Sequence, residues 1–192
     1  MGRQNLRGIR GPVLVVCNHI DDVDVGIILT ALPARLRHRL ATAAGGEALE
    51  ALRNPAATRN ILFRVFDRVE WALGVALLNL FPLPRQAGFR ESFAYAGESV
   101  DRGHSILVFP EGHHTTDGKL RRFHAGVGLL ANNLGIAVVP LRIDGLFELK
   151  QAKRRFAWPG QVRVNIGVPV QFPPQSDAEW IAGELRKRVQ EL

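Results

Sequence analysis

The chain has 192 residues and a formal net charge of +7 at neutral pH. Hydrophobic residues make up 46% and charged residues 22%, which excludes disorder, collagen and coiled coil. A single cysteine, Cys17, excludes a disulfide framework and a cysteine-rich zinc site. Most basic residues are arginines, whose guanidinium groups bind phosphate well. A biased genome composition explains the excess of arginine equally well. Positive charge without a recognised motif does not indicate nucleic-acid binding, so no nucleic-acid partner is expected.

Predicted strands and helices alternate along the chain. In chain order, the sequence predicts a strand at 12–17, a helix at 25–32, a strand at 39–44, helices at 58–80 and 89–102, a strand at 105–109, a loop at 110–122, a helix at 126–134, strands at 136–143 and 162–166, and a helix at 177–191. Pro140 favours an edge strand or a bulge. This alternation predicts an α/β fold with a mixed, mainly parallel sheet flanked by helices. We expect one domain over 1–192, with its core at about 12–170.

No apolar run reaches the ~18–20 residues of a transmembrane helix. The nearest, residues 71–83, is too short and is closed by Pro82 and Pro84. No signal peptide opens the chain, since residues 1–11 are polar and rich in glycine. The sequence therefore predicts a soluble or peripheral protein.

His19 directly follows the first predicted strand, at the carboxyl end where open α/β sheets place ligands. Asp24 comes five residues later, which on a continuous helix would turn the two side chains about 140° apart. A strand-to-helix turn between them would allow contact, and the carboxylate would then orient the ring as a general base. In the alternative interpretation, Asp21 or Asp22 is a helix N-cap, Asp24 interacts with the helix dipole and His19 is a turn residue.

A second polar segment, Phe109–Gly118, also follows a predicted strand and could line the same crevice. Glu111 would accept hydrogen bonds from substrate hydroxyls or pair with a base, whereas the alternative is a polar surface turn. The two segments together hold enough imidazoles and carboxylates for zinc or manganese. These side chains are His19, Asp21, Asp24, Glu111, His113, His114 and Asp117. A metal-dependent hydrolase is therefore a competing hypothesis, although no tight ligand spacing appears.

Four short motifs in order carry a resemblance to one known family. They are Asn18-His19 with Asp24 (N-H-x-x-x-x-D), Phe81–Arg85, Phe109–Gly112 (F-P-E-G) and Val138–Leu141. In this arrangement the chain resembles the lysophosphatidate/glycerolipid acyltransferase family over roughly residues 13–170. A catalytically silent lipid-binding module is a further alternative, against which the intact His19 and Asp24 count.

The resemblance implies an acyltransferase that moves a fatty acyl group from acyl-CoA or acyl carrier protein to the hydroxyl of a lysophosphatidate-like acceptor. Another lysolipid or a polar alcohol is the alternative acceptor. The implied roles are His19 as base, Asp24 as its orienting partner, Arg85 as phosphate ligand, Glu111 and Gly112 as acceptor contacts, His114 as a further substrate contact and Pro140 as part of the acyl site. It implies no metal and no cofactor besides the thioester co-substrate.

Several residues depart from the family pattern. His113 and His114 replace the Thr and Arg that usually follow F-P-E-G. A neutral imidazole cannot bind a phosphate with the two charged hydrogen bonds that an arginine provides. Arg121 and Arg122 are candidate substitutes. Asp21 replaces a serine and His124 a lysine.

The basic, apolar segment at 59–81 is expected either to lie at an anionic membrane interface or to pack on the sheet. The expected partners are the thioester donor, a lysolipid acceptor and a membrane surface. Only about a dozen residues precede the first predicted strand, so the chain resembles the compact acyltransferase domains that are sometimes fused to or associated with an acyl-activating enzyme; the alternative is a shortened piece of a longer protein. The expected localisation is cytoplasmic and peripheral, on the inner membrane face.

Overall fold

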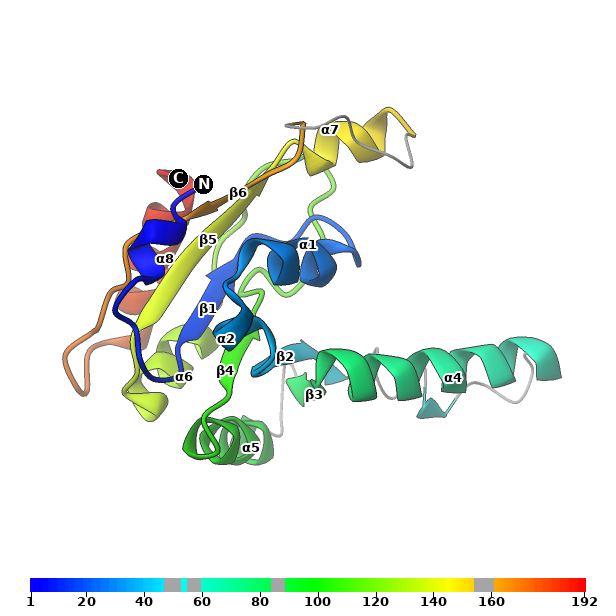
Figure 1. Ribbon diagram of the computed structural model, residues 1–192, viewed down its shortest axis with the longest axis horizontal. Coiled ribbons are helices and arrows are strands. Elements are labelled where there is room, and N and C mark those ends of the chain that lie inside the picture. The colour runs from blue at the N-terminus through cyan, green and yellow to red at the C-terminus, as the bar shows by residue number, and fades with distance from the viewer. Residues whose placement is uncertain (47–52, 55–59, 84–88, 154–160) are drawn as a thin grey trace.

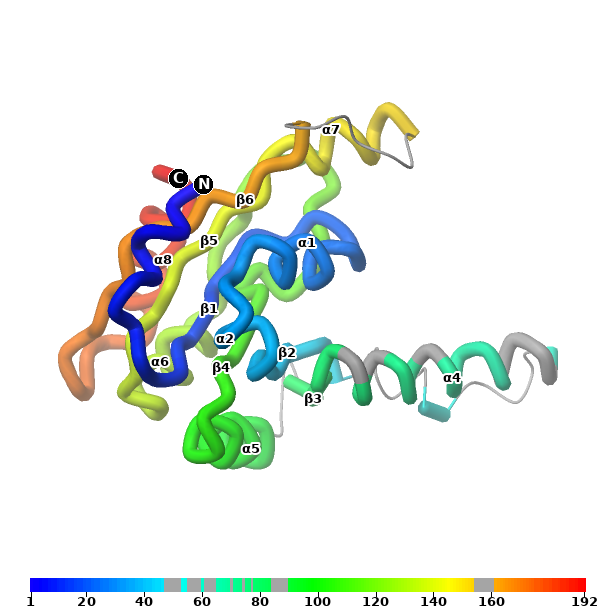
Figure 2. The backbone as a smooth tube through the Cα atoms, viewed as in Figure 1, coloured from blue at the N-terminus to red at the C-terminus, as the bar shows by residue number. Residues whose placement is uncertain are grey.

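A six-stranded sheet forms the centre of the computed structural model, which describes residues 1–46, 53–54, 60–83, 89–153 and 161–192 (Figures 1 and 2). The strand order is β3-β2-β4-β1-β5-β6. The strands are β1 (Leu14–Cys17), β2 (Leu40–Gly45), β3 (Leu80–Leu83), β4 (Ser105–Val108), β5 (Val138–Asp144) and β6 (Arg163–Ile166). All neighbouring pairs are parallel except β5 with β6. The predicted mixed, mainly parallel sheet is therefore confirmed.

Helices cover both faces of the sheet. They are the 3-10 helix η1 (Arg3–Leu6), α1 (Asp24–Ala31), α2 (Ala34–Arg37), α4 (Ile61–Leu78), α5 (Phe89–Asp101), α6 (Gly126–Leu134), α7 (Leu146–Gln151) and α8 (Ala178–Gln190). Side chains alternate across a strand, so Leu14 and Val16 of β1 join α5, α6 and α8 in one core. Val15 and Cys17 join η1, α1, α2 and α7 in the other. This three-layer arrangement explains why all four residues of β1 are buried.

The long predicted helix at 58–80 ends earlier than expected. Helix α4 stops at Leu78 because Asn79 adopts a left-handed φ of 48°, and the chain then enters β3. The sequence prediction also missed the short elements η1, α2 and α7. Each has only four to six residues, too few to display a helical period.

Pro140 lies inside the sheet, so the prediction of an edge strand is wrong: β5 runs between β1 and β6. The missing N–H is tolerated because β6 ends at Ile166, where Gly167 donates its N–H to the Pro140 carbonyl at 2.8 Å. Leu141 pairs with Ile166 but Val138 pairs with Val170, so the partner segment holds one additional residue. The alternative prediction, a bulge at this proline, describes that offset.

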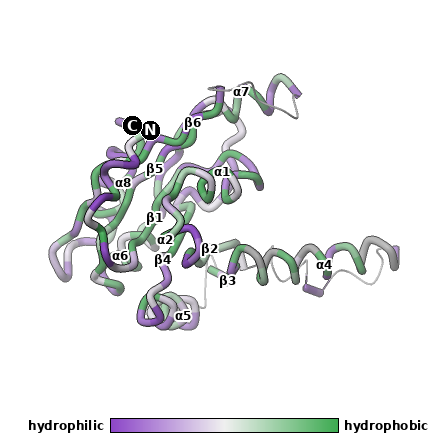
Figure 3. The backbone as a smooth tube through the Cα atoms, viewed as in Figure 1, coloured by the Kyte–Doolittle hydropathy of each residue, from purple (hydrophilic) through white to green (hydrophobic). Residues whose placement is uncertain are grey.

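Helix α4 extends away from the body of the molecule and packs mainly against β3 and β2 (Figure 1). Figure 3 shows hydrophobic residues recurring along it. Val65, Phe66, Val69 and Leu73 are each about half exposed or more. At 100° per residue they share one face about 100° wide. No helix in the described part of the chain has the length and hydrophobicity that crossing a bilayer requires.

Two helical glycines are predicted to respond to alanine with opposite signs. A Cβ at Gly128 of α6 would lie 2.1 Å from the Ala178 carbonyl oxygen of α8, whereas a Cβ at Gly97 of α5 meets nothing within 4 Å. Gly128→Ala should therefore lower the free energy of unfolding by about 1–3 kcal/mol through overpacking. Gly97→Ala should raise it by about 0.5–1 kcal/mol through helix propensity. Urea denaturation measures both, and equal effects would contradict the close α6–α8 approach.

Candidate active site

The Asn18 side chain fixes the chain as it leaves β1. Its Oδ1 accepts the Ile143 N–H at 2.8 Å and its Nδ2 donates to the Ile143 carbonyl at 3.0 Å. The amide thus continues the β1–β5 ladder with a side chain in place of backbone. The preceding thiol of Cys17 contacts the same Oδ1 at 3.4 Å, and burial raises the pKa of this thiol well above its ordinary value. Sequence reasoning assigned no role to Asn18, although an amide directly after a buried strand was a signal.

His19 and Asp24 are in direct contact, which is the first of the two arrangements that the sequence left open. His19 Nδ1 lies 2.8 Å from Asp24 Oδ2, and the aspartate is fully buried as the first residue of α1. The same oxygen accepts the N–H groups of Ile20 at 2.6 Å and Asp21 at 3.2 Å. A carboxylate only accepts, so Nδ1 is the donor and Nε2 is left for a substrate. The N-cap of α1 is Val23, without a side-chain cap, so neither Asp21 nor Asp22 caps this helix.

Two rings hold the imidazole of His19 from different sides. Phe109, after β4, stacks on it with centroids 4.2 Å apart and planes 16° apart. His114 meets it edge-on at 4.0 Å. Burial, together with the nearby His19, lowers the pKa of His114, so this histidine is neutral at neutral pH. His114 therefore lies beside the base, but without the charge of the arginine that the resemblance would place there.

Glu111 joins the two loops that form the site. Its side chain is buried; Oε1 accepts the His19 N–H at 2.9 Å and Oε2 accepts the Arg121 N–H at 2.7 Å. Burial raises the pKa of Glu111, although both N–H groups act in the opposite direction. Both carboxylate oxygens thus bind backbone N–H groups and join the two loops, while the expected contact of Glu111 with the acceptor stays a prediction. Gly112 adopts a φ of 73°, which favours glycine, in the turn that its N–H closes onto the Phe109 carbonyl.

Of the other predicted residues, Arg85 lies outside the described residues. Pro140 is buried in β5, where it pairs with Val16 of β1 and lies against Gly167. The two arginines proposed as phosphate ligands already have partners. Arg121 contacts Thr116 at 3.0 Å and Asp117 at 3.6 Å, and Arg122 pairs with Glu179 at 2.6 Å. Within the described ranges, no three His, Cys, Asp or Glu side chains converge as a metal ion would require.

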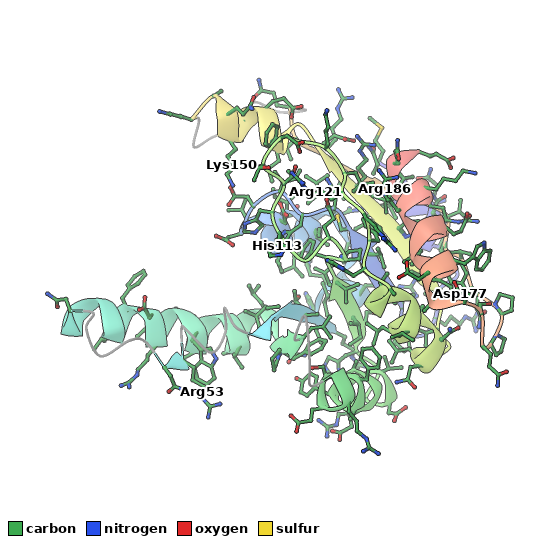
Figure 4. All side chains as sticks on the ribbon, turned by 180° about the vertical axis from the view of Figure 1, so that it is seen from behind. Arg53, His113, Arg121, Lys150, Asp177 and Arg186 are labelled. Carbon is green, nitrogen blue, oxygen red and sulfur yellow. The ribbon has the colours of Figure 1, made fainter. Side chains whose placement is uncertain are left out.

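Sequence reasoning also missed Lys150, on α7. Its Nζ lies 2.7 Å from Asp21 Oδ2 and 3.4 Å from the Ile20 carbonyl oxygen. Figure 4 shows Lys150, His113 and Arg121 on the same side of the molecule. No local signal could have found this contact, because Lys150 is 129 residues distant from Asp21 in the chain.

Glu111→Gln should destabilise the protein, because glutamine at this buried position offers one acceptor oxygen to two partly buried N–H groups. An unsatisfied buried donor costs about 1–3 kcal/mol. Chemical denaturation of this variant, beside the exposed control Glu191→Gln on the C-cap of α8, measures the difference. Unchanged stability of Glu111→Gln would contradict the bridging role.

Comparison with known proteins places this geometry in a family. The family model described as Acyltransferase matches residues 2–144. The chain is 28% identical over 130 residues to the chloroplastic 1-acyl-sn-glycerol-3-phosphate acyltransferase LPAT1 of Arabidopsis thaliana, a match over 66% of this chain and 35% of the relative. It is 32% identical over 130 residues to the chloroplastic 1-acyl-sn-glycerol-3-phosphate acyltransferase BAT2 of Brassica napus, a match over 66% of this chain and 36% of that protein. The match thus spans about a third of these relatives' length.

The crystal structure of the 1-acyl-sn-glycerophosphate acyltransferase PlsC from Thermotoga maritima is also similar. Its TM-score is 0.65 and its identity 25%, over 100% of this chain and 70% of that one. The family match over most of the chain and this shared fold agree with the motifs around His19 and Glu111. The chain therefore belongs to the Acyltransferase family.

Proposed function

We propose that this chain is an acyltransferase that transfers a fatty acyl group from a thioester to the hydroxyl of a lysophosphatidate-like acceptor. The thioester is acyl-CoA or acyl carrier protein. The observation that carries the proposal is the His19–Asp24 contact of 2.8 Å at the carboxyl end of β1, which leaves Nε2 for a substrate. The acceptor class is supported by the relatives from Arabidopsis thaliana and Brassica napus, both 1-acyl-sn-glycerol-3-phosphate acyltransferases.

The proposed chemistry is general-base catalysis followed by thioester exchange. His19 Nε2 takes the proton of the acceptor hydroxyl as the oxygen attacks the thioester carbonyl carbon. The tetrahedral intermediate then collapses: the carbon–sulfur bond breaks, and the departing sulfur takes up the proton from His19. Asp24 holds the ring through Nδ1 and stabilises the imidazolium that forms between the two steps. Phe109 and His114 restrict the rotation of the ring.

An acyl-transfer assay with mass-spectrometric readout tests this function. Purified protein is given acyl-CoA or acyl carrier protein and a panel of lysolipids and polar alcohols, before and after chelation. An acylated acceptor that forms in the presence of chelator supports the proposal. Release of free fatty acid that chelation abolishes would instead support the metal-dependent hydrolase.

His19→Ala should lower kcat by about 10²–10⁴, the usual contribution of a general base. Asp24→Asn should lose a large share of the same factor, and the double variant little more, because the two residues act as a unit. His38→Ala is the control, since this histidine is exposed at the end of α2. Circular dichroism checks that each variant folds. Near-normal turnover by folded His19→Ala would remove His19 from the mechanism.

We also propose that the exposed apolar face of α4 contacts a membrane surface. Its side chains Val65, Phe66, Val69 and Leu73 project from a helix that packs mainly on β3 and β2. The net charge of +7 would attract anionic lipid. The expected localisation at the inner membrane face depends on this proposal.

Vesicle sedimentation should show binding that rises with anionic lipid content and falls with salt, because salt shortens the screening length from about 10 Å at 0.1 M to about 3 Å at 1 M. Phe66→Asp should weaken binding at least about tenfold, since burying a phenylalanine contributes about 1.5–3 kcal/mol. Val168→Asp adds the same charge at an exposed residue outside α4 and is the control. Equal binding by both variants would exclude α4 as the contact.

A further inference from the structure

An ion pair ties helix α7 to the turn that carries the base. Lys150 Nζ lies 2.7 Å from Asp21 Oδ2, and the two side chains are 47% and 28% exposed. The hydrogen bond from Lys150 is the main reason that the pKa of Asp21 lies below its ordinary value. The backbone N–H of Asp21 in turn reaches the Asp24 oxygen that holds His19. Lys150 thus contacts the turn that connects His19 with Asp24.

The positive charge of Lys150 also acts on the loop opposite this turn. Lys150 and His19 both contribute to the lowered pKa of His114, whose Nε2 lies 3.4 Å from Asp22 Oδ1. His114 is neutral, and the side chains of Arg121 and Arg122 have partners on the loop and on α8. A phosphate on the carbon next to the reacting hydroxyl would have to lie near this turn. Lys150 is a cation that already reaches it.

We propose that Lys150 binds the phosphate of the acceptor and that Asp21 holds Lys150 in place until the acceptor arrives. This inference rests on the proposed function and names a residue that sets its acceptor specificity. Solvent screens a partly exposed ion pair and keeps it weak, so a phosphate can compete with the carboxylate for the ammonium. The ammonium has three donors, which lets it keep the Ile20 carbonyl while it turns to the phosphate. The serine usual at the position of Asp21 would offer no such competing charge.

The test compares kcat and KM for lysophosphatidate and for the monoacylglycerol with the same acyl chain. Lys150→Met should raise the KM for lysophosphatidate about tenfold or more, with a smaller change in kcat, and should reduce the preference for the phosphorylated acceptor by the same factor. Lys150→Arg should restore most of the preference. Asp21→Ser should lower the KM for lysophosphatidate, since it removes the competing carboxylate. Lys187→Met, which removes one exposed charge from α8, is the control and should change nothing.

Equal changes for both acceptors in Lys150→Met, or no change at all, would overturn the proposal and leave Lys150 as a partner of Asp21 only. A calorimetric titration with sn-glycerol 3-phosphate separates this result from failure of the proposed function, because it needs no acyl transfer. Lys150→Met should bind this compound at least about tenfold more weakly than wild type and Lys187→Met. If wild type acylates neither acceptor, the proposed function fails, and the titration alone decides the role of Lys150: equal affinity of wild type and Lys150→Met overturns it.

Discussion

The buried carboxylate of Asp24 is the interaction on which the site depends. One of its oxygens accepts the ring N–H of His19 and two backbone N–H groups, so the shape of the turn, the start of α1 and the ring orientation are set by one atom. A buried carboxylate is costly without such donors. If the turn changed its shape, the Asp24 carboxylate would either become exposed or lose its hydrogen-bond donors. Burying Asp24 therefore also holds the ring of His19 in one orientation, which the proposed general-base role requires.

The site also needs side chains from separate parts of the chain to lie together. The parallel sheet meets this need because it brings the ends of separate strands to one edge. β1 lies between β4 and β5, so the residues after Cys17, Val108 and Asp144 start from adjacent positions. Glu111 fastens the loop after β4 to the turn after β1, and Asn18 fastens that turn to β5. The Glu111 carboxylate, which accepts two backbone N–H groups, and the Asn18 amide, which takes the place of backbone, thus hold together three segments from distant parts of the chain.

Local signals predicted most of the sheet, and they allowed the His19–Asp24 contact without deciding it. Strands such as β1 are short runs of apolar, β-branched residues, and the spacing of His19 and Asp24 across a strand-to-helix turn permits only a few arrangements. Long-range partners could not be found in this way. Whether Glu111 faces a substrate or two backbone N–H groups depends on how the loops pack. Lys150 meets Asp21 only because α7, which follows β5, reaches the turn before α1. The prediction of an edge strand at Pro140 failed for the same reason. The proline is tolerated inside the sheet because β6 ends beside it, which depends on a partner strand distant in the chain.

The burial of Cys17 has a chemical consequence. The thiol is the single cysteine of the chain, it is shielded from solvent between β4 and β5, and its pKa is raised by burial and by the charges of Asp24 and Glu111. Alkylating reagents attack the thiolate, so the native protein should resist them even though the sulfur lies two residues from the base. Modification then requires opening of the central sheet, which makes the rate of alkylation a measure of that opening. Under the proposed function, this burial also protects Cys17 from an electrophilic thioester bound near His19.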